Sequence, residues 1–234
     1  MDLKKIYELI DTNKYPESHG ADKYHPGMSL FYYTFVYTFI SKKCVVLGSG
    51  SGFVPKILHY AQSELIKAGL LQQIDITLID ADIPEPWGER YYSKEGLLGY
   101  PFIKLINCKT DDVYNQFENI DYLHVDADHS EEQVYKDLCN YGSRMSSDDW
   151  IITCHDTVRW PGMTDHDSDV YNGVKKWSEE NNHICVNIPI GRGTALIMPN
   201  IEGRVPSKLY CEPITYRKMK QISDDKLFLV KNNI

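Results

Sequence analysis

Acidic and imidazole side chains stand directly after two short apolar runs of this sequence. These side chains are Asp126, Asp128, His129, His155 and Asp156. An apolar run that ends abruptly in such groups is typical of a buried parallel strand whose carboxyl end carries functional residues. If the two strands are neighbours, their ends lie about 4.8 Å apart, so the carboxylates converge. The pattern predicts one shared site that holds a cation or moves a proton.

Two carboxylates at one sheet edge repel each other, and a divalent cation with oxygen ligands is the simplest compensation. Mg²⁺ keeps several waters and needs only one or two carboxylates beside the oxygens of a substrate. We therefore expect Asp126 and Asp156 to be metal ligands. His155 is either a further ligand, which would shift the preference toward Mn²⁺ or Zn²⁺, or a hydrogen-bonding neighbour of the site.

A glycine-rich turn follows the first strand-like run and precedes a helical stretch. Its glycines, Gly48, Gly50 and Gly52, let the backbone approach a ligand closely, and the helix offers its positive N-terminal end. A dinucleotide fingerprint would need glycine at Phe53, and the Gly-Lys-Ser/Thr of a P-loop is missing, so both readings lose support. Asp80 ends the next strand, where a carboxylate can accept hydrogen bonds from both hydroxyls of a ribose.

The order of these motifs resembles that of class I S-adenosylmethionine-dependent methyltransferases. It is most similar to the branch of macrolide and aminocoumarin sugar O-methyltransferases, together with proteins labelled cephalosporin hydroxylases. The resemblance covers roughly residues 40–200, and the Asp-x-Asp-His-Ser segment beginning at Asp126 is its most specific part. One departure is Val46, because the family usually has an acidic residue two positions before the first glycine.

The resemblance implies that S-adenosylmethionine is the cofactor, with the glycine turn around its amino acid part. The residues implied in cofactor binding are Gly48, Ser49, Gly50, Gly52, Asp80, Asp111 and Asp112. Among them, Asp80 would bind the ribose, and Asp111 or Asp112 would approach the adenine. The resemblance also implies Mg²⁺ (or Mn²⁺) bound by Asp126 and by the pair His155-Asp156. In this pair histidine replaces the first of the family's two acidic residues.

Methylation of a hydroxyl requires a base, and Asp128 and His129 are the candidates. Histidine titrates near neutrality, whereas Asp128 matches the position of the proposed base in the aminocoumarin relatives. The alternative role of this turn is N-terminal capping of the helix that follows, a common use of Asp and Ser. We assign Ser130 to the cap and leave Asp128 and His129 open as the base.

Alternating strands and helices must position these groups. The expected strands are Cys44–Leu47, Asp75–Asp80, Phe102–Ile106, Tyr122–Asp126, Trp150–Cys154, Ile184–Ile188 and Thr194–Met198. The expected helices are Leu3–Ile10, Ser29–Ile40, Val54–Ala68, Asp111–Phe117, Glu131–Tyr141 and Asp169–Asn181. This alternation predicts an α/β fold with a doubly wound, mostly parallel seven-stranded sheet, which the resemblance identifies as Rossmann-like. The last two strands are too close for a crossover helix, so we expect an antiparallel final hairpin.

The 234 residues fit one domain. We expect an N-terminal helical cap (1–40), the S-adenosylmethionine-binding methyltransferase domain (41–200) and a C-terminal extension of that domain (201–234). The irregular, Pro- and Gly-rich segment Ile83–Pro101 predicts a lid, and the loop His19–Pro26 is expected to fold over the cofactor.

A formal net charge of -8 with dispersed basic residues disfavours a nucleic-acid partner. Apolar runs are too short to span a membrane, and the six cysteines form no Cys-x-x-Cys pair, which favours a cytoplasmic protein. The expected partner is a small-molecule acceptor, with no nucleic acid and no membrane; a homodimer is left open.

The sequence thus predicts a cation-assisted S-adenosylmethionine-dependent O-methyltransferase that acts on a small polar acceptor, such as a sugar, a nucleotide-activated sugar or a glycan precursor. The alternatives are a metal-dependent hydroxylase or hydrolase, and a non-catalytic cofactor-binding protein, which Val46 keeps open.

Overall fold

The computed structural model describes residues 1–12, 16–48, 52–81, 97, 99–146, 149–158 and 169–200. The chain divides into two units, Met1–Asn200 and Ile201–Ile234, and every described residue belongs to the first. Three expected features lie wholly or mostly outside the described residues: Ser49 and Gly50 of the glycine turn, the segment Ile83–Pro101 and the C-terminal extension.

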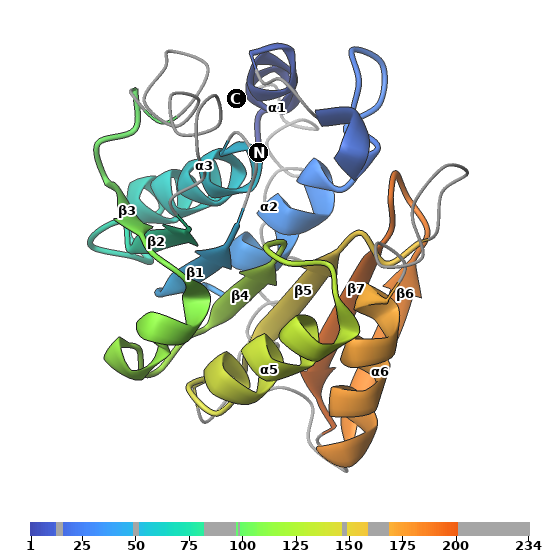
Figure 1. The fold of residues 1–234 in the computed structure, drawn as a ribbon. Coiled ribbons are helices and arrows are strands. Elements are labelled where there is room, and N and C mark those ends of the chain that lie inside the picture. Colours follow the sequence, from blue (N-terminus) through green and yellow to red (C-terminus); the bar gives the residue numbers. More distant parts are fainter. Residues whose placement is uncertain are drawn as a thin grey trace, which may run out of the picture. The chain divides into compact units, whose positions relative to one another are not determined.

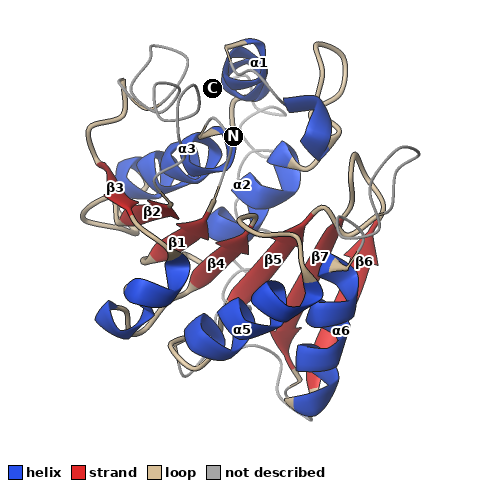
Figure 2. Ribbon diagram, viewed as in Figure 1, coloured by secondary structure: helices blue, strands red, loops and turns tan. Residues whose placement is uncertain are grey.

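A seven-stranded sheet runs through the described part of the chain (Figure 2). Its strands are β1 (Cys44–Leu47), β2 (Ile76–Asp80), β3 (Ile103–Asn107), β4 (Tyr122–Val125), β5 (Ile151–His155), β6 (His183–Ile188) and β7 (Thr194–Pro199). The strand order is β3-β2-β1-β4-β5-β7-β6. Neighbouring strands from β3 to β5 are parallel, whereas β7 is antiparallel to both β5 and β6. The predicted sheet and its antiparallel final pair are confirmed.

Helices cover both faces of the sheet. They are α1 (Leu3–Asp11), α2 (Ser29–Thr38), α3 (Phe53–Lys67), α5 (Glu131–Gly142) and α6 (Val170–Glu180), with 3₁₀ helices η1 (Pro16–His19), η2 (Thr110–Asp112) and η3 (Tyr114–Gln116). Figure 1 shows α2 and α3 on one face and α5 and α6 on the other. The sheet is therefore doubly wound, as the alternation of strands and helices predicts.

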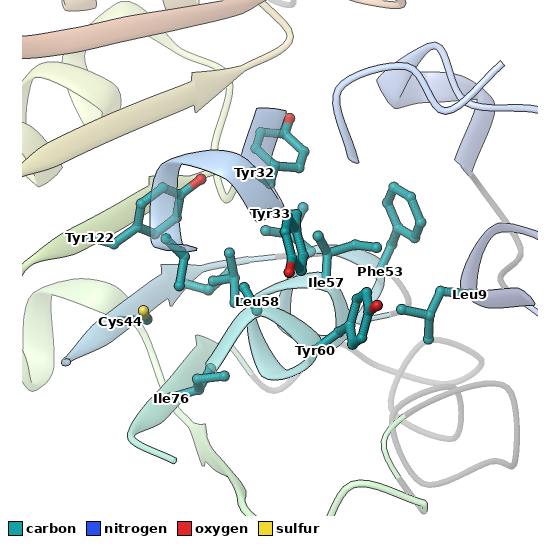
Figure 3. Packing of buried hydrophobic residues seen from close by; sticks show 14 of the residues in the cluster. Leu9, Tyr32, Tyr33, Cys44, Phe53, Ile57, Leu58, Tyr60, Ile76 and Tyr122 are labelled. Atoms are coloured by element: carbon teal, nitrogen blue, oxygen red, sulfur yellow. The ribbon is translucent and has the colours of Figure 1, made fainter. Parts of the chain in front are cut away.

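Alternate residues of each central strand pack into two separate hydrophobic cores. Cys44 and Val46 of β1 join a cluster with α1, α2 and α3, while Val45 and Leu47 join a cluster with α5 and α6. Figure 3 shows the first cluster, in which rings from α2 pack on apolar side chains of α3. All four β1 side chains are fully buried, which explains why the strand reads as one continuous apolar run.

The predicted α-helix Asp111–Phe117 is wrong, because this segment forms the 3₁₀ helices η2 and η3 instead. Lys109, which precedes η2, forms no capping hydrogen bond with its side chain. Asp111 uses its carboxylate to bind Lys136 and Asn140 of α5. Asp and Asn favour such bonds over a helix interior, and a segment this short cannot offset the cost of helix nucleation.

Asp137 on α5 makes the stability of this fold depend on pH. Its side chain is fully buried and accepts hydrogen bonds from Thr110 Oγ1 (2.6 Å) and Gln133 Nε2 (3.1 Å). Burial raises the pKa of Asp137 to about 6. Since the folded protein holds this proton more tightly than the unfolded chain, the free energy of unfolding falls as the pH rises from about 4 to above 6, by ~3 kcal/mol at most.

We expect Asp137→Asn to remove this contribution, because the amide oxygen can still accept both hydrogen bonds without a charge. The variant should unfold at a higher temperature than the parent at pH 7.5, and the difference should shrink at pH 4.5. Thermal unfolding at the two pH values measures it, with Asp111→Asn, a partly exposed acid in an ion pair, as the control. An unchanged pH dependence in Asp137→Asn would contradict the assignment.

Candidate functional site

Asp126 and Asp156 converge at the carboxyl end of the sheet. Asp126 follows β4 and Asp156 follows β5, and these strands are parallel neighbours. Asp156 has a left-handed backbone, with φ of +57°, and its side chain is only 4% exposed. The imidazole of His129 lies beside both acids, with Nε2 at 3.7 Å from Asp126 Oδ1 and 3.3 Å from Asp156 Oδ2. The predicted convergence of the two strand ends is therefore observed.

His155 faces the same two carboxylates from the end of β5. Its Nδ1 lies 3.2 Å from Asp126 Oδ1, and 3.3 Å from Asp156 Oδ1. The other nitrogen, Nε2, lies 3.1 Å from the carbonyl oxygen of Ser18, and a carbonyl only accepts, so Nε2 carries a proton. Burial acts to lower the pKa of His155, but the Asp126 carboxylate outweighs it and the pKa is raised. His155 thus lies at hydrogen-bond distance from Asp126, and its role as a metal ligand stays a prediction.

Among the described residues, two groups bring three candidate ligand atoms within 4.8 Å of one another. One joins Asp126, His129 and Asp156, and the other joins Asp126, His19 and His155. The expected ligands Asp126 and Asp156 share the first group, while His155 belongs with His19 in the second. Asp126 is common to both groups.

Asp128 and Ser130 organise the start of α5. The Ser130 hydroxyl accepts a hydrogen bond from the Gln133 backbone N–H (3.4 Å), so the predicted cap is confirmed. Ser130 also donates to Asp128 Oδ1 from its hydroxyl (2.6 Å) and its backbone N–H (2.8 Å). These hydrogen bonds, that from the hydroxyl foremost, lower the pKa of Asp128. An acid held in its ionised form is a weak base, so the turn favours His129 over Asp128.

The glycine turn touches the acidic centre. Gly48 has φ of +64°, and a Cβ at this position would lie 2.3 Å from the Asp126 carbonyl oxygen and 2.6 Å from Ala127 Cα. Gly52, with φ of +84°, precedes α3. Val46, which stands where the family usually has an acid, is fully buried in the core with α2 and α3. The turn that would hold a cofactor and the strand end that carries Asp126 are therefore in contact.

The other residues expected to bind cofactor lie at neighbouring strand ends. Asp80 ends β2, where it pairs in register with Asn107 of β3. Asp111 is partly buried, and its carboxylate lies 2.8 Å from Lys136 Nζ, whereas Asp112 is exposed. Their roles at the ribose and the adenine stay predictions.

Several residues that sequence reasoning did not assign to the site belong to it. His19 is buried, and its ring lies 4.0 Å from that of His155 between centroids. Arg192 places its guanidinium 3.8 Å from Asp156 Oδ2. His124 is fully buried, with Nε2 3.9 Å from Asp126 Oδ2. The sequence feature that could have pointed to His19 is the His-, Gly- and Pro-rich composition of its loop. That composition does not show on which edge of the sheet the loop packs.

The N-terminal loop is fixed at this sheet edge by glycines and backbone hydrogen bonds. The Ser18 carbonyl accepts from the Arg192 backbone N–H at 2.8 Å. A Cβ on Gly191 would lie 2.3 Å from the Gly20 nitrogen, so only glycine permits this approach. The loop therefore contacts the end of β5 and the turn before β7. Whether it also covers the cofactor stays a prediction.

No helix in the described ranges is both long and apolar enough to cross a membrane.

Residues 45–157 match a family model described as a methyltransferase domain. This range runs from β1 to the turn after β5 and so includes Gly48, Asp80, Asp126 and Asp156. No curated protein matches this sequence.

Solved structures share the fold at low sequence identity. A SAH-bound methyltransferase of Podospora anserina, PaMTH1, is 14% identical with a TM-score of 0.56, covering 83% of this chain and 86% of that one. An O-methyltransferase of Bacillus cereus in complex with SAH is 15% identical with a TM-score of 0.56, covering 85% and 90%. The O-methyltransferase TomG of Streptomyces achromogenes, involved in tomaymycin synthesis and in complex with SAM, is 11% identical with a TM-score of 0.54, covering 82% and 88%.

Proposed function

We propose that this chain, an S-adenosylmethionine-dependent methyltransferase by its domain match and its fold, transfers the methyl group to a hydroxyl of a small polar acceptor. The observation that carries the proposal is the contact of Gly48 with the Asp126 strand end. It brings the predicted cofactor turn next to a group of carboxylates and imidazoles. A methyl donor bound at the turn would therefore lie beside groups able to take a proton from an acceptor.

An oxygen acceptor is supported by the chemistry of the site. Asp126, Asp156 and His129 offer hydrogen-bond acceptors and a titratable ring, which suit a hydroxyl. Two of the structurally similar proteins are named O-methyltransferases. A sugar, a nucleotide-activated sugar or a glycan precursor, as the sequence resemblance implies, is the acceptor class that we propose. The hydroxylase, hydrolase and non-catalytic alternatives are not favoured, because the domain match is to a methyltransferase.

His129 is the base in this proposal. Its Nε2 faces the carboxylates of Asp126 and Asp156, which orient the ring and stabilise the imidazolium that forms when it takes the proton. The His129 side chain is 31% exposed, so an acceptor can reach it. The acceptor oxygen attacks the methyl carbon in line, the carbon–sulfur bond breaks, and the hydroxyl proton passes to His129. Positioning contributes more than covalent help in such a displacement.

A divalent cation, Mg²⁺ or Mn²⁺, is part of the proposal, with Asp126 and Asp156 as its ligands. The donor chemistry fits, because Asp156 Oδ1 is buried and has no hydrogen-bond partner among the described residues, although it lies 3.3 Å from His155 Nδ1. Such a cation would make the acceptor hydroxyl more acidic. His129 belongs to the same group of donor atoms, so the cation and the base need separate tests.

Calorimetry with S-adenosylhomocysteine tests the cofactor, with NAD as a control nucleotide that shares the adenosine part. We expect saturable binding of S-adenosylhomocysteine and no binding of NAD. A lack of binding at millimolar S-adenosylhomocysteine would contradict the proposed function. Turnover on a panel of sugars and nucleotide sugars, with and without chelator, then tests the rest. Full activity in excess chelator would remove the cation from the mechanism and leave methyl transfer in place.

A further inference from the structure

We propose that the buried side of Asp126 forms a binding site for a transition-metal cation such as Zn²⁺, with His19, His124 and His155 as the nitrogen ligands. This site differs from the group of Asp126, His129 and Asp156 that serves the acceptor. It uses three imidazoles that methyl transfer does not require. The inference stands apart from the proposed function, because metal binding can be measured without turnover.

Three buried imidazoles surround one carboxylate. His19, His124 and His155 are 4%, 0% and 2% exposed. Their ring centroids are 4.0, 6.3 and 6.4 Å apart. A cation about 2.1 Å from each nitrogen would separate the centres of its imidazole ligands by roughly 4.5 to 6.5 Å. The two separations that involve His124 fall in this range, and that between His19 and His155 is shorter. Asp126 lies among the rings, with Oδ1 3.2 Å from His155 Nδ1 and Oδ2 3.9 Å from His124 Nε2.

His124 presents an unpartnered nitrogen to Asp126. Its Nδ1 lies 2.8 Å from the Thr153 hydroxyl oxygen. The other ring nitrogen, Nε2, faces Asp126 Oδ2 at 3.9 Å. This Nε2 atom is buried without a hydrogen-bond partner in the described part of the chain. A buried polar atom left in this way is costly, and a cation would satisfy it.

One ring nitrogen each of His155 and His19 also lies at hydrogen-bond distance from a protein oxygen. His155 Nε2 donates to the Ser18 carbonyl at 3.1 Å, and His19 Nδ1 lies 3.1 Å from the Tyr32 hydroxyl. Histidine ligands usually hold their second nitrogen by a hydrogen bond to a carbonyl or a polar side chain, which fixes the tautomer and the ring. All three imidazoles therefore have the supporting contacts of metal ligands.

The donor set favours a transition metal over Mg²⁺. Imidazole nitrogen suits Zn²⁺ and its neighbours, whereas Mg²⁺ prefers oxygen.

The test is a titration of the metal-stripped full chain with Zn²⁺ by calorimetry and with Co²⁺ by visible absorption. We expect one saturable site per chain, and an affinity at least about 100-fold weaker in His19→Ala and in His124→Gln. Glutamine keeps a polar side chain beside Thr153, and thermal unfolding of each variant checks the fold. His25→Ala, an exposed histidine of the same loop, is the control and should bind as the parent does.

Two results would overturn the inference. One is the lack of saturable binding by the folded parent chain. The other is binding that survives in His19→Ala and His124→Gln but is lost in His129→Gln, because the metal would then sit in the group with Asp156. Neither result affects S-adenosylhomocysteine binding, so the failure of this inference and that of the proposed function are distinguishable.

Discussion

His129→Gln is expected to lower kcat by about 10²- to 10⁴-fold, the usual contribution of a general base, while S-adenosylhomocysteine binds with nearly the parent affinity. Glutamine retains a polar group between Asp126 and Asp156 but cannot take the proton. The measurement is methyl transfer from S-adenosylmethionine to an acceptor identified in the panel, with calorimetry for the cofactor.

The matched control is Asp128→Asn. Because Ser130 already holds the Asp128 carboxylate in its ionised form, we expect less than about a tenfold loss of kcat. The main effect should be a modest loss of stability, of about 1 kcal/mol or less, through the start of α5. If Asp128→Asn loses activity as fully as His129→Gln is expected to, while remaining folded, Asp128 is the base and our assignment is wrong.

Gly48→Ala is expected to destabilise the protein by about 2 to 5 kcal/mol and to abolish cofactor binding. Two costs combine: a positive φ disfavours any side chain by about 1 to 2 kcal/mol, and overpacking adds about 1 to 3 kcal/mol. The overpacking arises because the new Cβ would lie 2.3 Å from the Asp126 carbonyl oxygen. Relief of this clash must separate the glycine turn from the Asp126 strand end. Urea unfolding and S-adenosylhomocysteine calorimetry measure the two effects.

Gly69→Ala separates the two costs. Gly69 also has a positive φ, +73°, but a Cβ there would meet no atom within 4 Å. We expect a loss of about 1 to 2 kcal/mol from the backbone alone, with normal cofactor binding. Similar losses in both variants would show that the close approach of Gly48 to Asp126 does not matter.

Local pattern was sufficient for much of the fold. The strand Cys44–Leu47 is observed with the predicted bounds, and the other six agree within one residue at each end, because buried parallel strands need continuous apolar runs. Ser130 caps α5 as predicted, since capping depends on residues only three positions apart. The predicted α-helix Asp111–Phe117 was wrong, because this segment forms two 3₁₀ helices and the Asp111 side chain binds Lys136 and Asn140 of α5.

The chain's own sequence determined that Asp126 and Asp156 meet, because two parallel strands joined by one helix place their carboxyl ends side by side. The need for glycine at position 48 is tertiary, because a Cβ there would lie 2.3 Å from the carbonyl oxygen of Asp126. Tertiary structure alone decided the partners of these groups. Ser18 and His155, which are 137 residues apart, meet only when the N-terminal loop packs on the sheet edge. Whether His155 binds a cation beside Asp156 or donates a hydrogen bond to Asp126 depends on its ring orientation, which packing sets and local sequence pattern does not encode.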